Sequence, residues 1–472
     1  MKKMGITMLW CNTAKRLAGV TMKTVLFFLL FMLLTGCFGS SDAKPLHHDE
    51  IVYVNPSERT PQNLVMWHSM TAGNGLLLEE LIREFNETIG NDQGITVDLI
   101  FQGSYADSSA QLRTFLNTNN ISMLPDISQI DATGMIDIKN SPFLADAGIF
   151  ATLDPNFNTE LINLSMRNNI TYTERLLGLP FAVSTNILFY NKNILEEAGF
   201  NAAPSTLQDM AQILTRLSGG DILGFALSPA TPTVQNWIGQ QSGLSFVVNN
   251  QNGRGGLPTH VVFNEGNTMY TFLQEWKNLY KTGGLRHIEA NTLEEFVAGR
   301  IAMMVGSSSN IAAVTNAVDG RFALGASFFP RVNENAVYGS TLGGSSLFMF
   351  NKGDLDRMWA AWEVKKFLTS PEIQARWSMG TGYLAANYQT LERREYVEFL
   401  QNNPLFAVAM KQLEISNPNL QGIWVPSSFQ FFMELRNGII SMIEDDKTPA
   451  QTARDLEAAL NRILDDFHEA NR

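Results

Sequence analysis

The chain has 472 residues, of which 45% are hydrophobic and 17% charged, and its formal net charge is −12. This length and balance predict a globular body with a sizeable core, divided into two lobes rather than folded as one domain. The acidic charge argues against nucleic acid as a partner and against a basic patch that binds membrane surfaces.

The N-terminal region has the pattern of an exported protein. Lys23 precedes an apolar run at residues 25–34, which is too short to span a bilayer as an ordinary helix and is typical of a signal-peptide core. The string that follows, residues 34–37 (Leu-Thr-Gly-Cys), resembles the bacterial lipobox. The resemblance implies that residues 1–36 are a signal peptide and that Cys37 is lipidated. A plain secretory signal or a membrane anchor is the alternative, and either Met1 or Met22 can be the true start.

The segment after the lipobox is polar and has little to bury. We therefore predict that residues 37–60 form a flexible tether between the lipid and the folded body. Two acyl chains on one cysteine give stable anchoring, which predicts a protein held at the membrane of the cell envelope and facing the periplasm or exterior. The two cysteines, Cys11 and Cys37, both precede the folded body, so disulfides, thiolate catalysis and cysteine metal sites are excluded there.

The first part of the body alternates strand and helix patterns. Apolar strands are predicted near residues 63–66, 95–101 and 125–130, with helices between them, and this β-α-β-α-β order implies a parallel sheet. Ligands of such sheets bind beyond the carboxyl ends of the strands. Those ends are polar or aromatic, and they lie at residues 67–69, 102–105 and 131–133.

The pattern then restarts with an extended apolar segment at residues 179–190 and continues with helices and further strands. Residues 249–258 (NNQNGRGGLP) superficially resemble a phosphate loop but lack its Gly-Lys-Ser/Thr end, so we interpret them as a surface turn. A strand at residues 301–305 leads into a serine-rich turn at 306–310, and from Met358 onward the chain is mostly helical.

Several strings resemble the ABC importer solute-binding proteins of the maltose-binding class. They are residues 178–193 (GLPFAVSTNILFYNKN), 296–304 (FVAGRIAMM) and 343–347 (GGSSL). Within the class, the strings WHSM, GTGYL and KTPAQ resemble the glycerol-3-phosphate-binding proteins most; they lie at residues 67–70, 380–384 and 447–451. The likeness covers about residues 60–467.

The resemblance implies an α/β fold of the two-lobed periplasmic-binding type (type II), with a multi-stranded hinge. The N-terminal lobe is expected at residues 61–178 plus 304–341, and the C-terminal lobe at 179–303 plus 342–472. The chain would cross the hinge near residues 178–183, 300–306 and 340–346, where small residues tolerate rotation and close approach of a ligand.

The family's ligand positions carry over one at a time. They match Tyr105, Asp131, Ser184, Ser307 or Ser308, Gly343 or Gly344, and Tyr383; Trp67, at a strand end, is a further candidate. Where the family has an arginine that is expected to hold phosphate, this chain has Trp424. Tryptophan offers a flat face and one N–H donor, which shifts the expectation towards a neutral saccharide or a larger glycerol-phosphate derivative.

The expected partners are a small polar ligand (a saccharide, polyol or glycerol-phosphate derivative), the permease subunits of an ABC importer and, through the N-terminal lipid, the membrane. We expect the protein to be a monomer. We also expect no catalytic activity, cofactor or metal, because no nucleophile elbow, P-loop, zinc helix or paired-carboxylate signature lies in the sequence context that its chemistry needs. A carbohydrate-active hydrolase and a surface adhesin on the same anchor are the alternatives.

Overall fold

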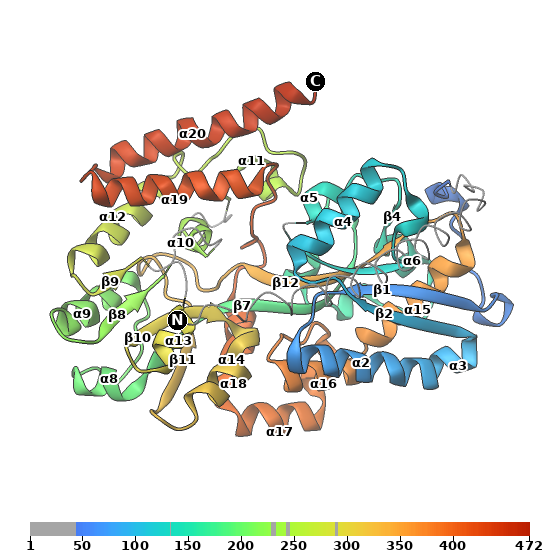
Figure 1. Cartoon of the computed structure of the whole chain (residues 1–472), viewed down its shortest axis with the longest axis horizontal. Coiled ribbons are helices and arrows are strands. Elements are labelled where there is room, and N and C mark those ends of the chain that lie inside the picture. The colour runs from blue at the N-terminus through green and yellow to red at the C-terminus, as the bar shows by residue number, and fades with distance from the viewer. Residues whose placement is uncertain (1–43, 133, 228–232, 242–245, 288–290) are drawn as a thin grey trace, which may run out of the picture. The chain divides into compact units, whose positions relative to one another are not determined.

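The computed structural model describes residues 44–472, apart from 133, 228–232, 242–245 and 288–290 (Figure 1). The predicted signal peptide, the lipidation site Cys37 and tether residues 37–43 therefore lie outside the described residues. Among the helices of the described part, none has the length and apolar character needed to cross a membrane.

A mixed sheet runs through the body in the order β2-β1-β3-β12-β7-β10-β8-β9, with β4 beside β12 and β11 beside β7. A separate hairpin pairs β5 with β6. The strands are β1 (Gln62–His68), β2 (Ile95–Phe101), β3 (Ile127–Asp131), β4 (Leu144–Ala145), β5 (Thr171–Tyr172), β6 (Arg175–Leu176), β7 (Leu179–Asn191), β8 (Leu223–Ala226), β9 (Leu285–Arg286), β10 (Ile301–Ser307), β11 (Leu324–Phe328) and β12 (Leu342–Phe350).

We call the strands β1 to β4 and β12, with the helices packed on them, the first lobe. Strand β1 pairs in parallel with both β2 and β3, which confirms the predicted β-α-β-α-β unit. Helices α2 and α4 lie on opposite sides of β1 and β2 (Figure 1). The first-lobe helices are α2 (Ala72–Glu87), α3 (Ile89–Gln93), α4 (Tyr105–Asn117), α5 (Met135–Ile138), α6 (Ala147–Leu153), α7 (Leu164–Asn169), α15 (Leu355–Leu368) and α16 (Pro371–Thr381).

The second lobe consists of β8 to β11 and the helices packed on them. Helices α19 and α20 run side by side along one edge of this lobe (Figure 1). Its helices are α8 (Lys192–Glu197), α9 (Leu207–Leu217), α10 (Val234–Gly239), α11 (Asn249–Gly253), α12 (Thr268–Lys281), α13 (Thr292–Val297), α14 (Ile311–Val318), α18 (Pro404–Ile415), α19 (Ser428–Glu444) and α20 (Pro449–Ala470). Helix α17 (Arg394–Asn402) packs against both α16 and α18.

Strand β7 belongs to both lobes. Its residues 179–185 pair with β12, and its residues 186–191 pair with β10 and β11. Nearly all of its 13 residues are buried, which is the pattern of a strand covered on both faces and explains its continuous apolar sequence. The first crossing between the lobes therefore lies within this one strand.

The predicted lobe boundaries were wrong for two later segments. The segment at residues 304–341 was predicted to belong to the N-terminal lobe. It contains the end of β10 and all of β11, and both strands pair with the second-lobe part of β7. Strand β12, assigned to the C-terminal lobe, pairs with β3 of the first lobe. The crossing predicted at 300–306 is absent for the same reason; the chain returns to the second lobe after α16, where α18 packs on β11. Strand propensity alone could not show which neighbour each of these segments would choose.

The predicted tether is also shorter than expected, because residues 45–60 lie against the first lobe. Leu46 exchanges two hydrogen bonds with the Asn351 side chain, and the Trp359 indole donates to the Val52 carbonyl at 2.8 Å. Ile51 is buried. Side chains of the first lobe thus hold the segment by hydrogen-bonding its backbone groups. The polar composition of the segment gives no indication of these bonds, because the bonding side chains lie elsewhere in the chain.

Candidate functional site

A cavity of about 370 Å³, which we call the first cavity, lies where the two lobes meet. Both lobes and the crossing strands contribute to it. Its lining residues are Tyr105, Asp131, Ala132, Ser184, Thr185, Asn186, Thr233, Gln235, Ser307, Ser309, Thr341, Leu342, Gly343, Gly344, Tyr383, Gly422, Ile423 and Phe432. Seven of the ten residues predicted from the sequence are among them: Tyr105, Asp131, Ser184, Ser307, Gly343, Gly344 and Tyr383.

Two tyrosines from distant parts of the first lobe meet in this cavity. Tyr105 opens helix α4 after the N-cap Ser104, and its hydroxyl donates to the Ser345 Oγ atom at 3.0 Å. Tyr383 follows Gly382, which ends α16 at φ 82°, and its ring stacks on the buried Trp377 with centroids 5.8 Å apart. Burial raises the pKa of both hydroxyls. Both phenols therefore stay neutral at physiological pH and can donate or accept.

Asp131 is the last residue of β3, at the carboxyl end of a strand as the sequence predicted. It lies opposite Ser345 in the antiparallel β3–β12 pair, so the crossing strand holds it in place. Beside it, Gly344 has φ 78°, and a Cβ atom there would lie 2.0 Å from the Ala182 carbonyl oxygen. Glycine is thus required at this position, where the main chain itself forms the wall of the cavity.

The cavity is nearly free of charge. Asp131 is the only charged side chain among its described lining residues, which include no lysine, arginine or histidine. Hydroxyl groups, two amides, glycine backbone and aromatic rings make up most of the remainder. Such a lining can hydrogen-bond a neutral polar solute and stack against a ring, but it offers no cation to neutralise a dianion.

The other three predicted residues lie outside the lining. Trp67 is 6% exposed and packs against Phe115 of α4, because its side chain points into the core and not towards the cavity. Ser308 is fully buried, and its Oγ atom accepts a hydrogen bond from the Thr185 amide at 3.3 Å. Trp424 is 1% exposed and lies beneath the Arg254 guanidinium, whose Cζ atom is 4.5 Å from the ring centroid.

Several lining residues were missed from the sequence. Asn186 had a signal, because residues two apart on a strand share a face and Ser184 was already a candidate. Thr233, Gln235 and Phe432 belong to second-lobe segments that no motif marks, and only the folded arrangement brings them to the cavity.

Among the described residues, no group of three or more His, Cys, Asp or Glu side chains is arranged to hold a metal ion.

Comparison with known families gives one match over most of the chain. Residues 80–408 match the model of the family described as bacterial extracellular solute-binding protein. The sn-glycerol-3-phosphate-binding periplasmic protein UgpB of Yersinia enterocolitica is 24% identical over 425 residues, which cover 86% of this chain and 93% of that protein. The UgpB protein of Pectobacterium atrosepticum is also 24% identical, over 87% of this chain and 93% of that protein.

Solved structures share the fold at lower identity. UgpB from Mycobacterium tuberculosis, in complex with glycerophosphocholine, superposes with a TM-score of 0.69 at 20% identity, covering 86% of this chain and 99% of that one. The sugar-binding protein MalE from Xanthomonas citri superposes with a TM-score of 0.71 at 19% identity, covering 87% of this chain and 99% of that one. These neighbours have the two-lobed periplasmic-binding fold, as predicted from the sequence.

Proposed function

Because the chain belongs to the bacterial extracellular solute-binding proteins, which capture a solute for an ABC importer, we propose that its ligand is a neutral carbohydrate bound in the first cavity. The observation that carries this choice is the charge of the lining: one carboxylate, Asp131, and no cation among the described residues. A phosphate dianion would lose its hydration there without gaining an ion pair.

The residue types in the cavity suit a sugar. The Asp131 carboxylate can accept hydrogen bonds from two ring hydroxyls. Because the acceptor is charged, these bonds are stronger than those between neutral groups. Ser184, Ser307 and the backbone around Gly343 supply further donors and acceptors at fixed positions. The rings of Tyr105 and Tyr383 offer faces against which the apolar side of a pyranose can pack.

The proposed mechanism is closure of the lobes around the ligand. Ligand contacts come from both sides of the crossing strands, so the solute binds better when both lobes reach it, and binding shifts the population towards that state. The liganded form would then dock on the permease subunits. We propose in addition that a lipid on Cys37 holds the protein at the membrane while it does so.

A second candidate ligand is a glycerophosphodiester that carries a quaternary ammonium group. Asp131 beside the two tyrosines is a favourable environment for such a cation. Ser307 and Ser309, which precede helix α14, could receive a singly charged phosphodiester.

The two candidates are separated by calorimetry on the purified protein with maltose, maltotriose, sn-glycerol 3-phosphate and glycerophosphocholine. We expect a neutral saccharide to bind, and Asp131→Ala to weaken its binding at least about tenfold. The matched control is Asp98→Ala, which removes an exposed carboxylate on β2. Preference for sn-glycerol 3-phosphate, with no effect of Asp131→Ala, would contradict the proposal.

A further inference from the structure

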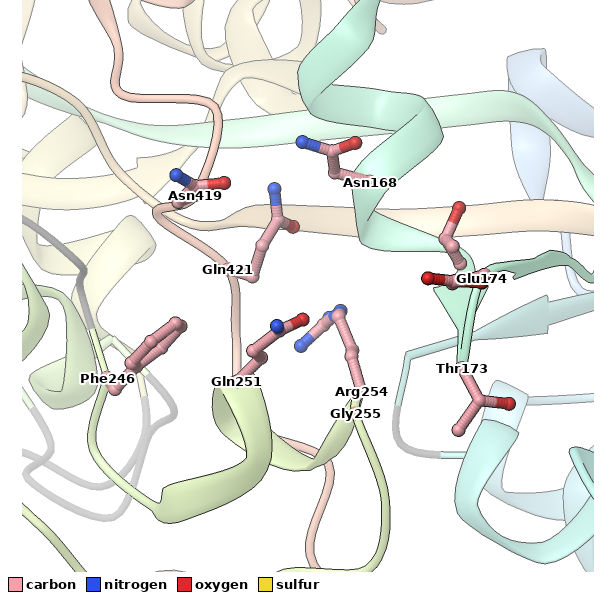
Figure 2. Close-up of a pocket in the computed structure, with 10 residues that line it drawn as sticks. Asn168, Thr173, Glu174, Phe246, Gln251, Arg254, Gly255, Asn419 and Gln421 are labelled. Atoms are coloured by element: carbon pink, nitrogen blue, oxygen red, sulfur yellow. The ribbon is translucent and has the colours of Figure 1, made fainter.

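A second and larger cavity, of about 770 Å³, lies apart from the first (Figure 2). First-lobe residues from the end of α7 and the β5–β6 hairpin form one wall, and second-lobe residues around α11 form another. Its lining residues are Asn168, Thr171, Thr173, Glu174, Phe246, Gln251, Arg254, Gly255, Asn419 and Gln421. The volume is in the range of sites that hold drug-sized ligands, roughly 300–1,000 Å³.

The two cavities share no lining residue and are separated by the segment at residues 421–424. Gln421 lines the second cavity, whereas the next two residues, Gly422 and Ile423, line the first. A void of about 10 Å³ that Trp424 and Asn169 help to enclose adjoins the first cavity and shares no lining residue with the second; it has about the space of a single water molecule. The second cavity is therefore a site of its own and not an extension of the first.

Gln421 forms a rigid part of the wall of the second cavity. It is 6% exposed, and its amide nitrogen donates to two carbonyl oxygens, those of Ser165 at 3.2 Å and Pro418 at 2.6 Å. These two bonds fix the orientation of the amide. Its Oε1 atom is left as a buried acceptor that no described residue supplies with a hydrogen. Because this atom is enclosed by the protein, Gln421 shapes the cavity wall and its Oε1 atom is not a contact point for a ligand.

Arg254 excludes an anion as the natural occupant. Its guanidinium donates to the Asn169 backbone oxygen, to Asn169 Oδ1 at 3.0 Å and to the Gly422 carbonyl. Four of its five N–H groups are engaged in this way. No described carboxylate is within ion-pair distance, and burial lowers the pKa of Arg254 to about 9. The guanidinium joins the two lobes across the wall and is not presented to the cavity as a phosphate or carboxylate receptor.

The lining of the second cavity is rich in amides. Figure 2 shows Asn168, Asn419, Gln251 and Gln421 around the cavity, with the ring of Phe246 at one side. Amides present a donor and an acceptor side by side, as vicinal hydroxyl groups do, and an aromatic ring packs against the apolar face of a sugar. Glu174 adds an acceptor and no positive charge.

Backbone conformations of high energy also gather at this cavity. Thr173 and Glu174 at the hairpin turn have φ of 45° and 70°, and residues 250–252 have φ between 53° and 55°. The Thr173 amide donates to the Arg254 carbonyl at 2.7 Å, which links the two strained segments. Conformations of this kind, above all for a β-branched residue, cluster at ligand-contacting sites.

We propose that the second cavity is a binding site for a neutral oligosaccharide of two or three units, separate from the solute site in the first cavity. The ligand would hydrogen-bond the amides of Asn168, Asn419 and Gln251 and pack on Phe246. Because it touches both lobes, an occupant would also favour the same closed arrangement as the ligand of the first cavity.

The test is a count of sites on the purified protein with maltotriose, cellotriose and raffinose as probes, by saturation-transfer NMR and calorimetry. Gly255→Phe fills the second cavity; a Cβ there has no neighbour nearer than 3.5 Å, and the backbone is not left-handed. Gln251→Ala combined with Asn419→Ala removes two exposed amides without touching the core. Asp131→Ala disables only the first cavity.

We expect at least one probe to bind twice per chain, with both second-cavity variants losing about tenfold or more in the affinity of one site. Asp131→Ala should keep that site and lose the other. If Gly255→Phe abolishes the binding of none of the probes, the second site does not exist. This conclusion is independent of whether a probe binds in the first cavity. If binding is lost only in Asp131→Ala, the function proposed for the first cavity stands alone; if only in Gly255→Phe, the second site stands and the first does not.

Discussion

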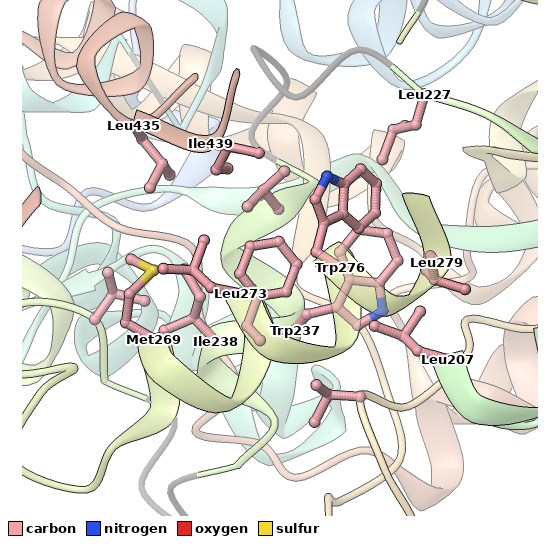
Figure 3. Packing of buried hydrophobic residues seen from close by; sticks show 14 of the residues in the cluster. Leu207, Leu227, Trp237, Ile238, Met269, Leu273, Trp276, Leu279, Leu435 and Ile439 are labelled. Atoms are coloured by element: carbon pink, nitrogen blue, oxygen red, sulfur yellow. The ribbon is translucent and has the colours of Figure 1, made fainter. Parts of the chain in front are cut away.

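The two lobes bury their polar groups in different ways. In the first lobe, buried carboxylates hold cations: Asp126 with Arg357 and Lys352, Asp154 with Lys366, and Glu363 with Arg59. The core of the second lobe is apolar, with Trp237 and Trp276 at its centre among leucine, isoleucine and methionine side chains (Figure 3). The indole nitrogen of Trp237 donates to the Pro330 carbonyl at 2.9 Å.

The position of these ion pairs explains the difference. Each of the four joins an early segment of the first lobe, residues 59–154, to the late segment at residues 352–366. In the chain, the late segment comes only after strands β8 to β11 of the second lobe. Ion pairs are directional, so they can favour one arrangement of the late segment against the early one, whereas apolar contacts allow several. We infer that the three carboxylates fix this arrangement. The predictions below test that contrast, from the largest expected effect to the smallest.

Removing the central carboxylate should have the largest effect. Asp126 is 1% exposed and accepts from Arg357 through both oxygens at 2.6 Å, from Lys352, and from the Val65 amide. Asp126→Ala leaves two cations unpaired and is expected to destabilise the fold by about 3–5 kcal/mol in urea unfolding. Asp126→Asn, which can still accept from Val65, should cost less. Equal and small losses in both would show that the pairs do not order the lobe.

The part of β12 that pairs with β7 near the crossing between the lobes should be the next most sensitive place. Gly344→Ala places a Cβ against the Ala182 carbonyl at φ 78°, and we expect a loss of about 1–3 kcal/mol together with weaker ligand binding. Gly343→Ala is the matched control, because its Cβ would meet only Ser184 Oγ at 3.6 Å. Thermal unfolding and calorimetry would check both. An unchanged Gly344→Ala variant would contradict the role given to this backbone.

The site could be predicted where the chain signals it locally. Asp131 ends a strand, Tyr105 begins a helix, and Gly344 has a backbone conformation that excludes other residues, so each leaves a mark in the sequence. Trp424 shows the limit. A motif position tells which residue stands where a ligand group is expected, but not that the indole turns under Arg254, a residue of the supposed surface turn at 249–258.

The fold could be predicted as far as local pattern decides it. The three parallel strands of the first lobe follow from alternation and spacing. The partners of β10 and β12 do not, because the local sequence of a strand does not specify which neighbouring strand it will pair with. Long-range pairing is decided by the whole assembled sheet, which is why segments 304–341 and 342–472 were assigned to the wrong lobes in part.

Lys365 is a first-lobe cation without the ion pairs described above. Lys365 is fully buried, its Nζ atom has no hydrogen-bond partner among the described residues, and burial lowers its pKa to about 7. Between pH 7 and the ordinary lysine value near 10.4, the unfolded chain holds the extra proton, so stability rises with pH across this window. Below it both states are protonated, and the unfavourable burial is felt in full.

Lys365→Met should therefore stabilise the protein by about 1–3 kcal/mol at pH 6, and the gain should shrink towards pH 9. Urea unfolding at the two pH values measures it. The neighbouring Lys366, paired with Asp154 at 2.8 Å, is the matched control, and Lys366→Met should destabilise instead. A gain that is independent of pH would mean that the folded and unfolded states bind the same number of protons between pH 6 and pH 9, so that burial does not lower the pKa of Lys365.

The smallest effect is expected at the wall between the two cavities. Trp424→Phe keeps a ring beneath Arg254 and removes the Nε1–H group, which has no hydrogen-bond partner among the described residues. We expect stability within about 0.5 kcal/mol of the original and ligand affinity in the first cavity changed less than about twofold. Trp424→Ala, by contrast, leaves a hole under a buried guanidinium and should cost about 3–5 kcal/mol. A tenfold loss of affinity in the phenylalanine variant would mean that the indole N–H reaches the ligand, as the sequence-based hypothesis held, and that the wall opens on binding.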